Sequence, residues 1–301
     1  MNPDQLTEVL RLGLIQTTVD DGSAWAGSLN MSKIEEERAV AEIQQHLFSL
    51  GRETPKPDIV ILPEVAVPLG FLNRLRKAAA SLNFVIIAGL DFQVATRISP
   101  KHVMNRAAVI VPDGWGRRDR SSGTTLRYVG KTYPAYREKA DLATLGYDFH
   151  CIPEVWVFDA GRFGKFAVAI CYDFLDLERV AMYRLNVQHL FIVSYNKDIT
   201  SFDHAAEALA RMIYCNVVVC NTGTYGGSLA VSPYLRPERR LIYRHSGSKL
   251  STSQTITLPV RSLYQAQLNE WPPDKAREFK SLPPSSDGVL KLEPKSEPLS
   301  S

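Results

Sequence analysis

Three reactive side chains follow short apolar runs of the sequence, and together they could support catalysis by a thiol. Cys171 comes directly after the run Lys165–Ile170, and Glu64 and Lys131 also stand at the ends of predicted strands. A thiol is a poor nucleophile until a base removes its proton, and Glu64 could be that base. The cation of Lys131 could lower the pKa of the thiol and stabilise the oxyanion formed when sulfur adds to a carbonyl or nitrile carbon.

The elements that position these residues are predicted to be strands alternating with helices. Ser32 followed by Glu35 is a capping-box pattern, and it predicts the start of a helix that continues to about Gly51. The runs Asp58–Leu62 and Lys165–Ile170 are dense in apolar residues, which is typical of strands covered on both faces. Because hairpins are also indicated, the sequence predicts an α/β protein with mixed sheets.

Length, composition and charge limit the class of protein. The chain has 301 residues, 45% of them hydrophobic, and a net charge of +3, which is too small to argue for nucleic-acid binding. No apolar run approaches membrane-spanning length and no secretory leader is visible, so we expect no membrane and a cytoplasmic location. Repeated Pro, Ser, Lys and Glu predict a folded domain over 1–264 and a tail over 265–301 that either wraps a partner or stays disordered.

The cysteines and histidines do not have the spacing of metal ligands. Neither a CxxC nor a CxxH pattern occurs among the four cysteines, which stand at 151, 171, 215 and 220. The histidines are also scattered, so a metal-dependent hydrolase is disfavoured and we expect neither a metal nor an organic cofactor.

The order of these blocks is similar to that of the nitrilase, or carbon–nitrogen hydrolase, superfamily. The resemblance runs from about residue 10 to 258 and is strongest in four blocks: DIVILPE at 58–64, NRAAVIVPDG at 105–114, GRFGKFAVAICYD at 161–173 and GGS at 226–228. It implies a four-layer αββα sandwich and hydrolysis or transfer at non-peptide C–N bonds. It also implies a homodimer formed through helices next to the nucleophile, or a higher homo-oligomer.

The resemblance also implies roles for individual residues. Glu64 matches the general base, Lys131 the oxyanion-stabilising lysine and Cys171 the nucleophile. Glu138 is the candidate for the second glutamate, which orients the lysine in such sites. The backbone N–H of Tyr172 would complete the oxyanion hole.

The lysine block departs from the common pattern and leaves alternatives open. In the run VGKTYP, Tyr133 stands where a His is more usual, so we expect Tyr133 to line the pocket. Lys139 is a rival for the role of Lys131, although the position after a strand favours Lys131. Glu154 is a weaker rival for the role of Glu138.

Further pocket residues are expected at the ends of two later strands. Tyr195 and Asn196 follow one strand and Asn221 follows another, where they could bind a substrate or simply form turns. Asp173 is a candidate cap for the next helix.

Two functions fit these patterns. The first is a thiol-dependent hydrolase whose small nitrogenous substrate is an amide, a nitrile or a carbamoyl compound. The alternative is a catalytically altered ligand-binding or interaction module within a larger assembly. The altered lysine block and the long polar tail motivate that alternative.

Overall fold

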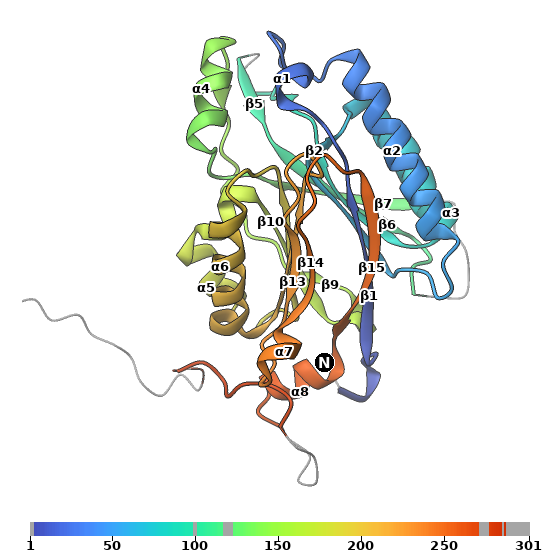
Figure 1. Ribbon diagram of the computed structural model, residues 1–301, viewed down its shortest axis with the longest axis vertical. Helices are drawn as coiled ribbons and strands as arrows, with labels where there is room; N and C mark the ends of the chain where they lie inside the picture. The colour runs from blue at the N-terminus through green and yellow to red at the C-terminus, as the bar shows by residue number, and fades with distance from the viewer. Residues whose placement is uncertain (1–2, 99–100, 117–122, 271–276, 285, 287–301) are drawn as a thin grey trace, which may run out of the picture.

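The computed structural model describes residues 3–98, 101–116, 123–270, 277–284 and 286. Two facing β-sheets form the centre of the molecule, and helices cover the outer face of each sheet (Figure 1). The order of layers is therefore αββα, which confirms the predicted four-layer sandwich. Among the described residues, no helix is both long enough and apolar enough to cross a membrane.

The first sheet contains six strands in the order β15-β1-β2-β3-β6-β7. Strands β1, β2 and β3 run parallel, whereas β15, β6 and β7 join antiparallel, so the sheet is mixed as predicted. Its strands are β1 (Val9–Gln16), β2 (Ile59–Val67), β3 (Val85–Leu90), β6 (Arg106–Pro112), β7 (Thr124–Gly130) and β15 (Thr252–Pro259).

The second sheet also contains six strands, in the order β14-β13-β12-β11-β10-β9. Its centre is parallel and its edges are antiparallel. The strands are β9 (Phe158–Asp159), β10 (Lys165–Ile170), β11 (His189–Ser194), β12 (Asn216–Asn221), β13 (Ser228–Val231) and β14 (Leu241–His245). A small third sheet contains β4 (Gln93–Val94), β5 (His102–Met104) and β8 (Asp148–Phe149).

Alternating side chains of the central strands build two cores. In β2, Ile59 and Ile61 belong to the core shared with the second sheet, whereas Val60 and Leu62 belong to the core under the helices of the first sheet. Successive side chains of a strand point to opposite faces, so a strand covered on both sides must be apolar throughout. The covering helices are α2 (Lys33–Gly51) and α3 (Leu72–Leu82) on the first sheet, and α5 (Leu177–Tyr183) and α6 (Ile199–Leu209) on the second (Figure 1).

The remaining helical segments are short. The α-helices are α1 (Asp21–Ala24), α4 (Tyr136–Thr144), α7 (Pro237–Arg240) and α8 (Arg261–Gln267). The 3₁₀ turns are η1 (Pro3–Gln5), η2 (Leu69–Phe71), η3 (Gly161–Phe163) and η4 (Cys171–Leu175), and η5 (Ala210–Tyr214) is a π-helical turn.

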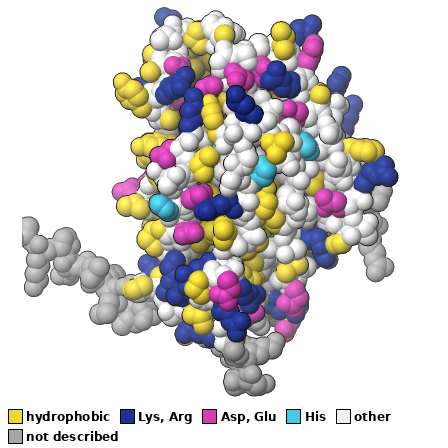
Figure 2. All heavy atoms as spheres, viewed as in Figure 1, with side chains coloured by type: hydrophobic (Ala, Val, Ile, Leu, Met, Phe, Trp, Pro, Cys, Tyr) yellow, Lys and Arg dark blue, Asp and Glu magenta, His cyan; other side chains and the backbone are white. Residues whose placement is uncertain are grey.

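The C-terminal part of the described chain lies against the body of the protein. The expected boundary at residue 264 falls inside α8, and Phe279 is buried with its ring stacked on Tyr234 at 4.6 Å between centroids. Lys and Arg side chains gather at the end of the molecule that carries α7 (Figure 2). Arg211 donates to the carbonyl of Ser281. Residues 271–276, 285 and 287–301 of the expected tail lie outside the described residues.

Local sequence signals account for most of these elements. Ser32 caps α2 by accepting from the N–H of Glu35, as predicted, and the predicted run Lys165–Ile170 is β10. The turn η4 separates Cys171 from α5, and the cap of α5 is Asp176 rather than the expected Asp173. Helix α4 lies where the sequence shows no clear periodicity, since Leu142 is its one buried residue.

A close approach between β2 and β3 gives a prediction about Gly89. A Cβ atom at this position would lie 2.2 Å from the carbonyl oxygen of Pro63 and 2.4 Å from Cα of Glu64. Gly89→Ala must therefore displace the backbone that carries Glu64, and we expect the free energy of unfolding to fall by about 1–3 kcal/mol. Denaturation by urea measures this change.

Gly70→Ala is the matched control, because the nearest atom to its new methyl group would be Glu36 Oε1 at 3.5 Å, an ordinary contact. Equal destabilisation by the two substitutions would contradict the steric explanation.

Candidate active site

Glu64 lies near the distorted end of β2, where its carboxylate is buried. The residue is 3% exposed, and the pairing of β2 with β3 shifts register between Leu62 and Val67. Val65 has a φ of 46°, a conformation that a β-branched residue rarely adopts. This kink ends the regular ladder and lets the Glu64 carboxylate reach groups from both sheets: it accepts from Lys131 Nζ at 2.7 Å and from the backbone N–H of Tyr195 at 2.9 Å.

Lys131 is a buried cation held between two carboxylates. It follows β7, is 2% exposed, and its Nζ lies 2.7 Å from Glu64 Oε1 and 2.5 Å from Glu138 Oε2. Asn105 completes the cluster, because its Nδ2 donates to Glu64 Oε1 at 2.8 Å and to Glu138 Oε1 at 2.9 Å. The N–H of Ala135 also donates to Glu138, at 3.1 Å, and so anchors the first turn of α4.

Cys171 is the first residue of the turn η4, immediately after β10. Its φ is 47°, so the backbone turns sharply at the sulfur-bearing residue. The residue is 7% exposed, and the hydroxyl of Ser194 donates to its Sγ at 3.6 Å. The first N–H groups of a helical turn have no partner within that turn, so the N–H of Tyr172 is available to a ligand.

The charges of this cluster set its protonation. Burial raises the pKa of Glu64, and the charge of Glu138 adds to that rise, while Lys131 opposes it. Burial alone would lower the pKa of Lys131, but the two glutamates raise it well above its ordinary value. Burial and the charge of Glu64 raise the pKa of the Cys171 thiol to about 12. At neutral pH the thiol is therefore protonated beside a lysine cation, and it needs a base during attack.

These groups open into a cavity of about 560 Å³. Its lining includes Glu64, Lys131, Glu138 and Cys171, together with Tyr195 and Asn196 from the loop after β11. The structure thus brings the four predicted catalytic residues and two of the predicted substrate-binding residues to one cavity. A cavity of this volume is in the range of small-molecule sites.

Three predicted substrate-binding residues do not line this cavity. Tyr133 is 46% exposed, and its backbone N–H donates to Asp173. Tyr172 is 49% exposed. Asn221 is buried, but its Nδ2 donates to the carbonyls of Asn196 and Gly226, so it shapes the loop that carries Asn196. The interpretation of Asn221 as turn chemistry therefore fits the structure better than substrate binding.

The rival residues lie outside the cluster. Lys139 is exposed on α4, one position past Glu138. Glu154 is also exposed, and its carboxylate accepts from Trp156 Nε1 at 3.0 Å. The position after a strand was the signal that separated Lys131 from Lys139.

Two residues at the site were not singled out for these positions by the sequence. One is Asn105, and the other is Asp173, which is fully buried and accepts from the N–H groups of Thr132 and Tyr133 at 2.8–3.1 Å. Asp173 thereby fixes the segment that follows Lys131. Asp173 stands two residues after Cys171, but its partners lie about 40 positions earlier in the chain, and no local sequence pattern indicates such a contact.

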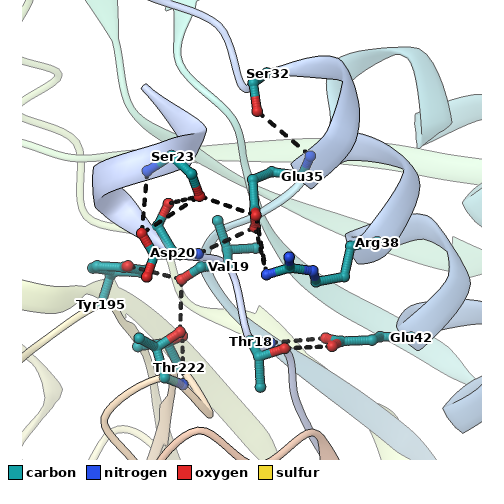
Figure 3. Close-up of polar contacts among 11 residues, drawn as sticks. Thr18, Val19, Asp20, Ser23, Ser32, Glu35, Arg38, Glu42, Tyr195 and Thr222 are labelled. Carbon is teal, nitrogen blue, oxygen red and sulfur yellow. Dashed lines mark hydrogen bonds and ion pairs between the residues drawn. The ribbon is translucent and has the colours of Figure 1, made fainter. Parts of the chain in front are cut away.

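The outer wall of the cavity is tied to the site through Tyr195. Its hydroxyl donates to the carbonyl of Val19 at 2.8 Å, in the segment that leads from β1 into α1 (Figure 3). Helix α2 also holds this segment, because the backbone N–H of Thr18 donates to Glu42 and the backbone N–H of Asp20 donates to Glu35 (Figure 3). Glu64 and this wall therefore share one anchor residue, Tyr195.

Aromatic rings form much of that wall. Trp25 lies edge-on to Phe92 at 5.9 Å and to Tyr195 at 6.0 Å between ring centroids. Its indole N–H donates to Asp91 at 2.9 Å, which fixes the ring. Leu29, also in the lining, extends the apolar surface.

Charged side chains also belong to the lining of the cavity, among them Asp21, Arg137 and Lys197. The carboxylate of Asp21 lies 3.1 Å from Lys197 Nζ and 3.8 Å from the guanidinium of Arg137. Among the residues that the structure describes, no group of three or more His, Cys, Asp or Glu side chains could hold a metal ion.

The raised pKa values give a prediction for the reactivity of Cys171. If Glu64 is the base, alkylation of Cys171 by iodoacetamide needs the ionised carboxylate. We expect the rate to rise through the pKa of Glu64, which lies above 4.5, and to level off far below the thiol pKa of about 12. Mass spectrometry of the Cys171 peptide measures the rate in a Cys151→Ser background, which removes the exposed cysteine.

The rise of the labelling rate through the pKa of Glu64 is the acid limb of the pH profile. Glu64→Gln should abolish this acid limb and slow labelling at least about a hundredfold. A profile that tracks the ordinary ionisation of a thiol, in the parent protein and in the variant alike, would contradict the role of Glu64.

Solved structures with the same architecture belong to one superfamily. Nit3 of Saccharomyces cerevisiae, a member of branch 10 of the nitrilase superfamily, has a TM-score of 0.61 at 16% identity, covering 90% of this chain and 97% of that chain. XC1258 of Xanthomonas campestris, a CN-hydrolase superfamily protein, has a TM-score of 0.61 at 14% identity, covering 90% and 100%. An amidase from Nesterenkonia sp. has a TM-score of 0.58 at 14% identity, covering 84% and 92%.

Comparisons at the level of sequence find no matching family model and no matching curated protein. The fold is what these similarities show at such low identity. The chain has the nitrilase, or carbon–nitrogen hydrolase, superfamily fold.

Proposed function

We propose that this protein is a thiol-dependent hydrolase of non-peptide C–N bonds, acting on an amide, a nitrile or a carbamoyl compound. The observation that carries the proposal is the opening of the Glu64–Lys131–Glu138 cluster and Cys171 into one cavity. It is supported by the amidases among the similar structures, one of which carries the acetamide moiety of fluoroacetamide on its active-site cysteine. A ligand-binding module has no need of a buried base beside a protonated thiol.

In the first half of the reaction on an amide, Cys171 adds to the carbonyl carbon. Its proton passes to Glu64 as the carbon–sulfur bond forms, so a free thiolate never accumulates beside two carboxylates. The carbonyl oxygen becomes an oxyanion, which accepts from Lys131 Nζ and from the N–H of Tyr172. Glu64 then gives the proton to the leaving nitrogen, the C–N bond breaks, and ammonia or an amine departs from the thioester.

In the second half, water hydrolyses the thioester. Glu64 takes a proton from water as its oxygen adds to the thioester carbon, and the same two donors stabilise the oxyanion. When the carbon–sulfur bond breaks, the sulfur of Cys171 regains the proton from Glu64 and the carboxylic acid is released. Lys131 keeps its proton throughout, because its Nζ still contacts the carboxylate of Glu138 while Glu64 carries the transferred proton.

The lining of the cavity favours a substrate with a sizeable apolar acyl group. Trp25, Phe92 and Leu29 form apolar surface beyond the catalytic groups, and the cavity of about 560 Å³ exceeds what acetamide would fill. Each buried CH₂ group contributes about 0.8 kcal/mol to binding, so longer acyl chains should be preferred.

A substrate panel with a nucleophile variant tests the proposed activity. Nitriles, aliphatic amides, N-carbamoyl compounds and ω-amides are assayed for ammonia release, with short and long acyl chains in each class. We expect at least one class to be hydrolysed, with a higher kcat/KM for longer apolar chains. Cys171→Ala should abolish turnover, because no other described cysteine lines the cavity.

Cys215→Ala is the matched control, since Cys215 is buried away from the cavity and should be dispensable for turnover. Undiminished ammonia release by Cys171→Ala would refute the thiol mechanism.

We further propose that the protein forms a homodimer through the region of α5. Exposed apolar side chains on and beside this helix support the proposal: Leu177 is 71% exposed, Met182 is 56% exposed and Leu175 is 42% exposed. Apolar side chains gathered on one element are typical of protein–protein interfaces. The helix follows η4, so this interface would lie close to the nucleophile.

A charge placed on α5 tests the dimer. We expect Leu177→Glu to convert a dimer to a monomer, because a carboxylate would be buried without a partner in the interface. Ile34→Glu is the matched control, since Ile34 is 74% exposed on α2, which covers the other sheet. Sedimentation velocity reports the mass, and a monomeric parent protein would contradict the proposal.

A further inference from the structure

Asn105 is the uncharged member of the buried cluster and contacts each of its charged members. It stands between β5 and β6, is 1% exposed and lines the cavity. Its side chain donates to both Glu64 and Glu138, and its carbonyl accepts from the N–H of Lys131 at 2.9 Å. One residue therefore fixes the backbone of the lysine and the side chains of both glutamates.

The orientation of the Asn105 amide follows from charge. Two carboxylate oxygens face the amide, so Nδ2 must point at them, because Oδ1 in that place would be repelled by both. The consequence is that Oδ1 has no hydrogen-bond partner among the described residues, although it is buried. Leaving a buried acceptor unpaired is unfavourable, and the two charge-assisted hydrogen bonds of Nδ2 offset that cost.

The two carboxylate oxygens of Glu64 accept different numbers of hydrogen bonds. Oε1 accepts from both Asn105 and Lys131, whereas among the described residues Oε2 accepts only from the backbone N–H of Tyr195. A carboxylate oxygen has about two acceptor sites, so Oε1 is saturated and Oε2 has one site left. The proton from Cys171 must therefore go to Oε2.

We propose that Asn105 is a positioning residue, which saturates Oε1 of Glu64 and so makes Oε2 the atom that receives the proton from Cys171. It acts through the two glutamates and need not touch the substrate. This inference rests on the proposed function, because it assigns the geometry of the proposed base.

The pH profile of Cys171 alkylation separates this role from simple packing. The titratable groups that face Glu64 are Lys131, Glu138 and Cys171. Burial raises the pKa of Glu64, and the hydrogen bond from Asn105 opposes that rise. Loss of the hydrogen bond should therefore raise this pKa further, so a higher pH is needed to ionise the base.

The experiment uses the full chain in the Cys151→Ser background, with iodoacetamide as the probe. For Asn105→Ala we expect the acid limb to move upward by about one pH unit and the plateau rate to fall at least about tenfold. Asn105→Asp keeps the shape but replaces the donor with a third carboxylate, so its limb should move further. Asn105→Ser replaces Asn105→Ala if the latter does not fold, as judged by thermal unfolding.

Asn216→Ala is the matched control. Asn216 is also buried, its Nδ2 also donates twice, to Pro259 and His189, and its Oδ1 is also unpaired. It lies at the start of β12, at the opposite end of the strand from Asn221 and the cavity. Its substitution should lower the unfolding temperature without moving the acid limb.

The outcomes separate the two proposals. The role of Asn105 would be overturned if folded Asn105 variants kept the acid limb and the plateau rate of the parent protein. It would also be overturned if Asn216→Ala shifted the acid limb equally. Neither result would affect the proposed role of Glu64. An acid limb in the parent protein that persists in Glu64→Gln would overturn the base itself, and with it the proposed function.

Discussion

The ion pair of Lys131 with the buried carboxylate of Glu64 and the partly buried carboxylate of Glu138 is the interaction on which the site depends. Moving three charges out of water costs several kcal/mol per ion, and only close, hydrogen-bonded contacts offset that cost. Each partner comes from a different element: Glu64 from β2, Lys131 from the end of β7 and Glu138 from α4. The charges therefore hold these elements together, and removal of one partner would leave another uncompensated, at a cost of about 3–5 kcal/mol.

The site also joins the two sheets. Glu64 belongs to the first sheet and accepts from the N–H of Tyr195, which follows a strand of the second sheet, while Cys171 follows β10 of the second. Val65 and Cys171 each have a φ in the left-handed region, which costs about 1–3 kcal/mol per residue. The packed sandwich must supply that energy, so the geometry of the site exists only when both sheets have come together.

Local patterns in the sequence predicted much of the fold, and contacts between distant segments explain what they missed. An apolar run that stops at a polar residue marks the end of a buried strand, which is why Glu64, Lys131 and Cys171 could be selected; their catalytic roles stay predictions. Asn105 and Asp173 form hydrogen bonds with residues 33–41 positions away in the chain. Local residue patterns do not indicate contacts between such distant positions. Helix α4 was not predicted, because a helix with one buried residue has no apolar stripe and so no hydrophobic periodicity.

The protonated state of Cys171 has a consequence for chemical damage. Peroxides oxidise thiolates, and a sulfur whose pKa is about 12 holds almost no thiolate at neutral pH. The resting sulfur is also 7% exposed, so an oxidant has little access to it. If Cys171 acts as proposed, its sulfur should therefore resist conversion to sulfenic acid between turnovers, so the protonated resting state would protect the residue that the reaction uses.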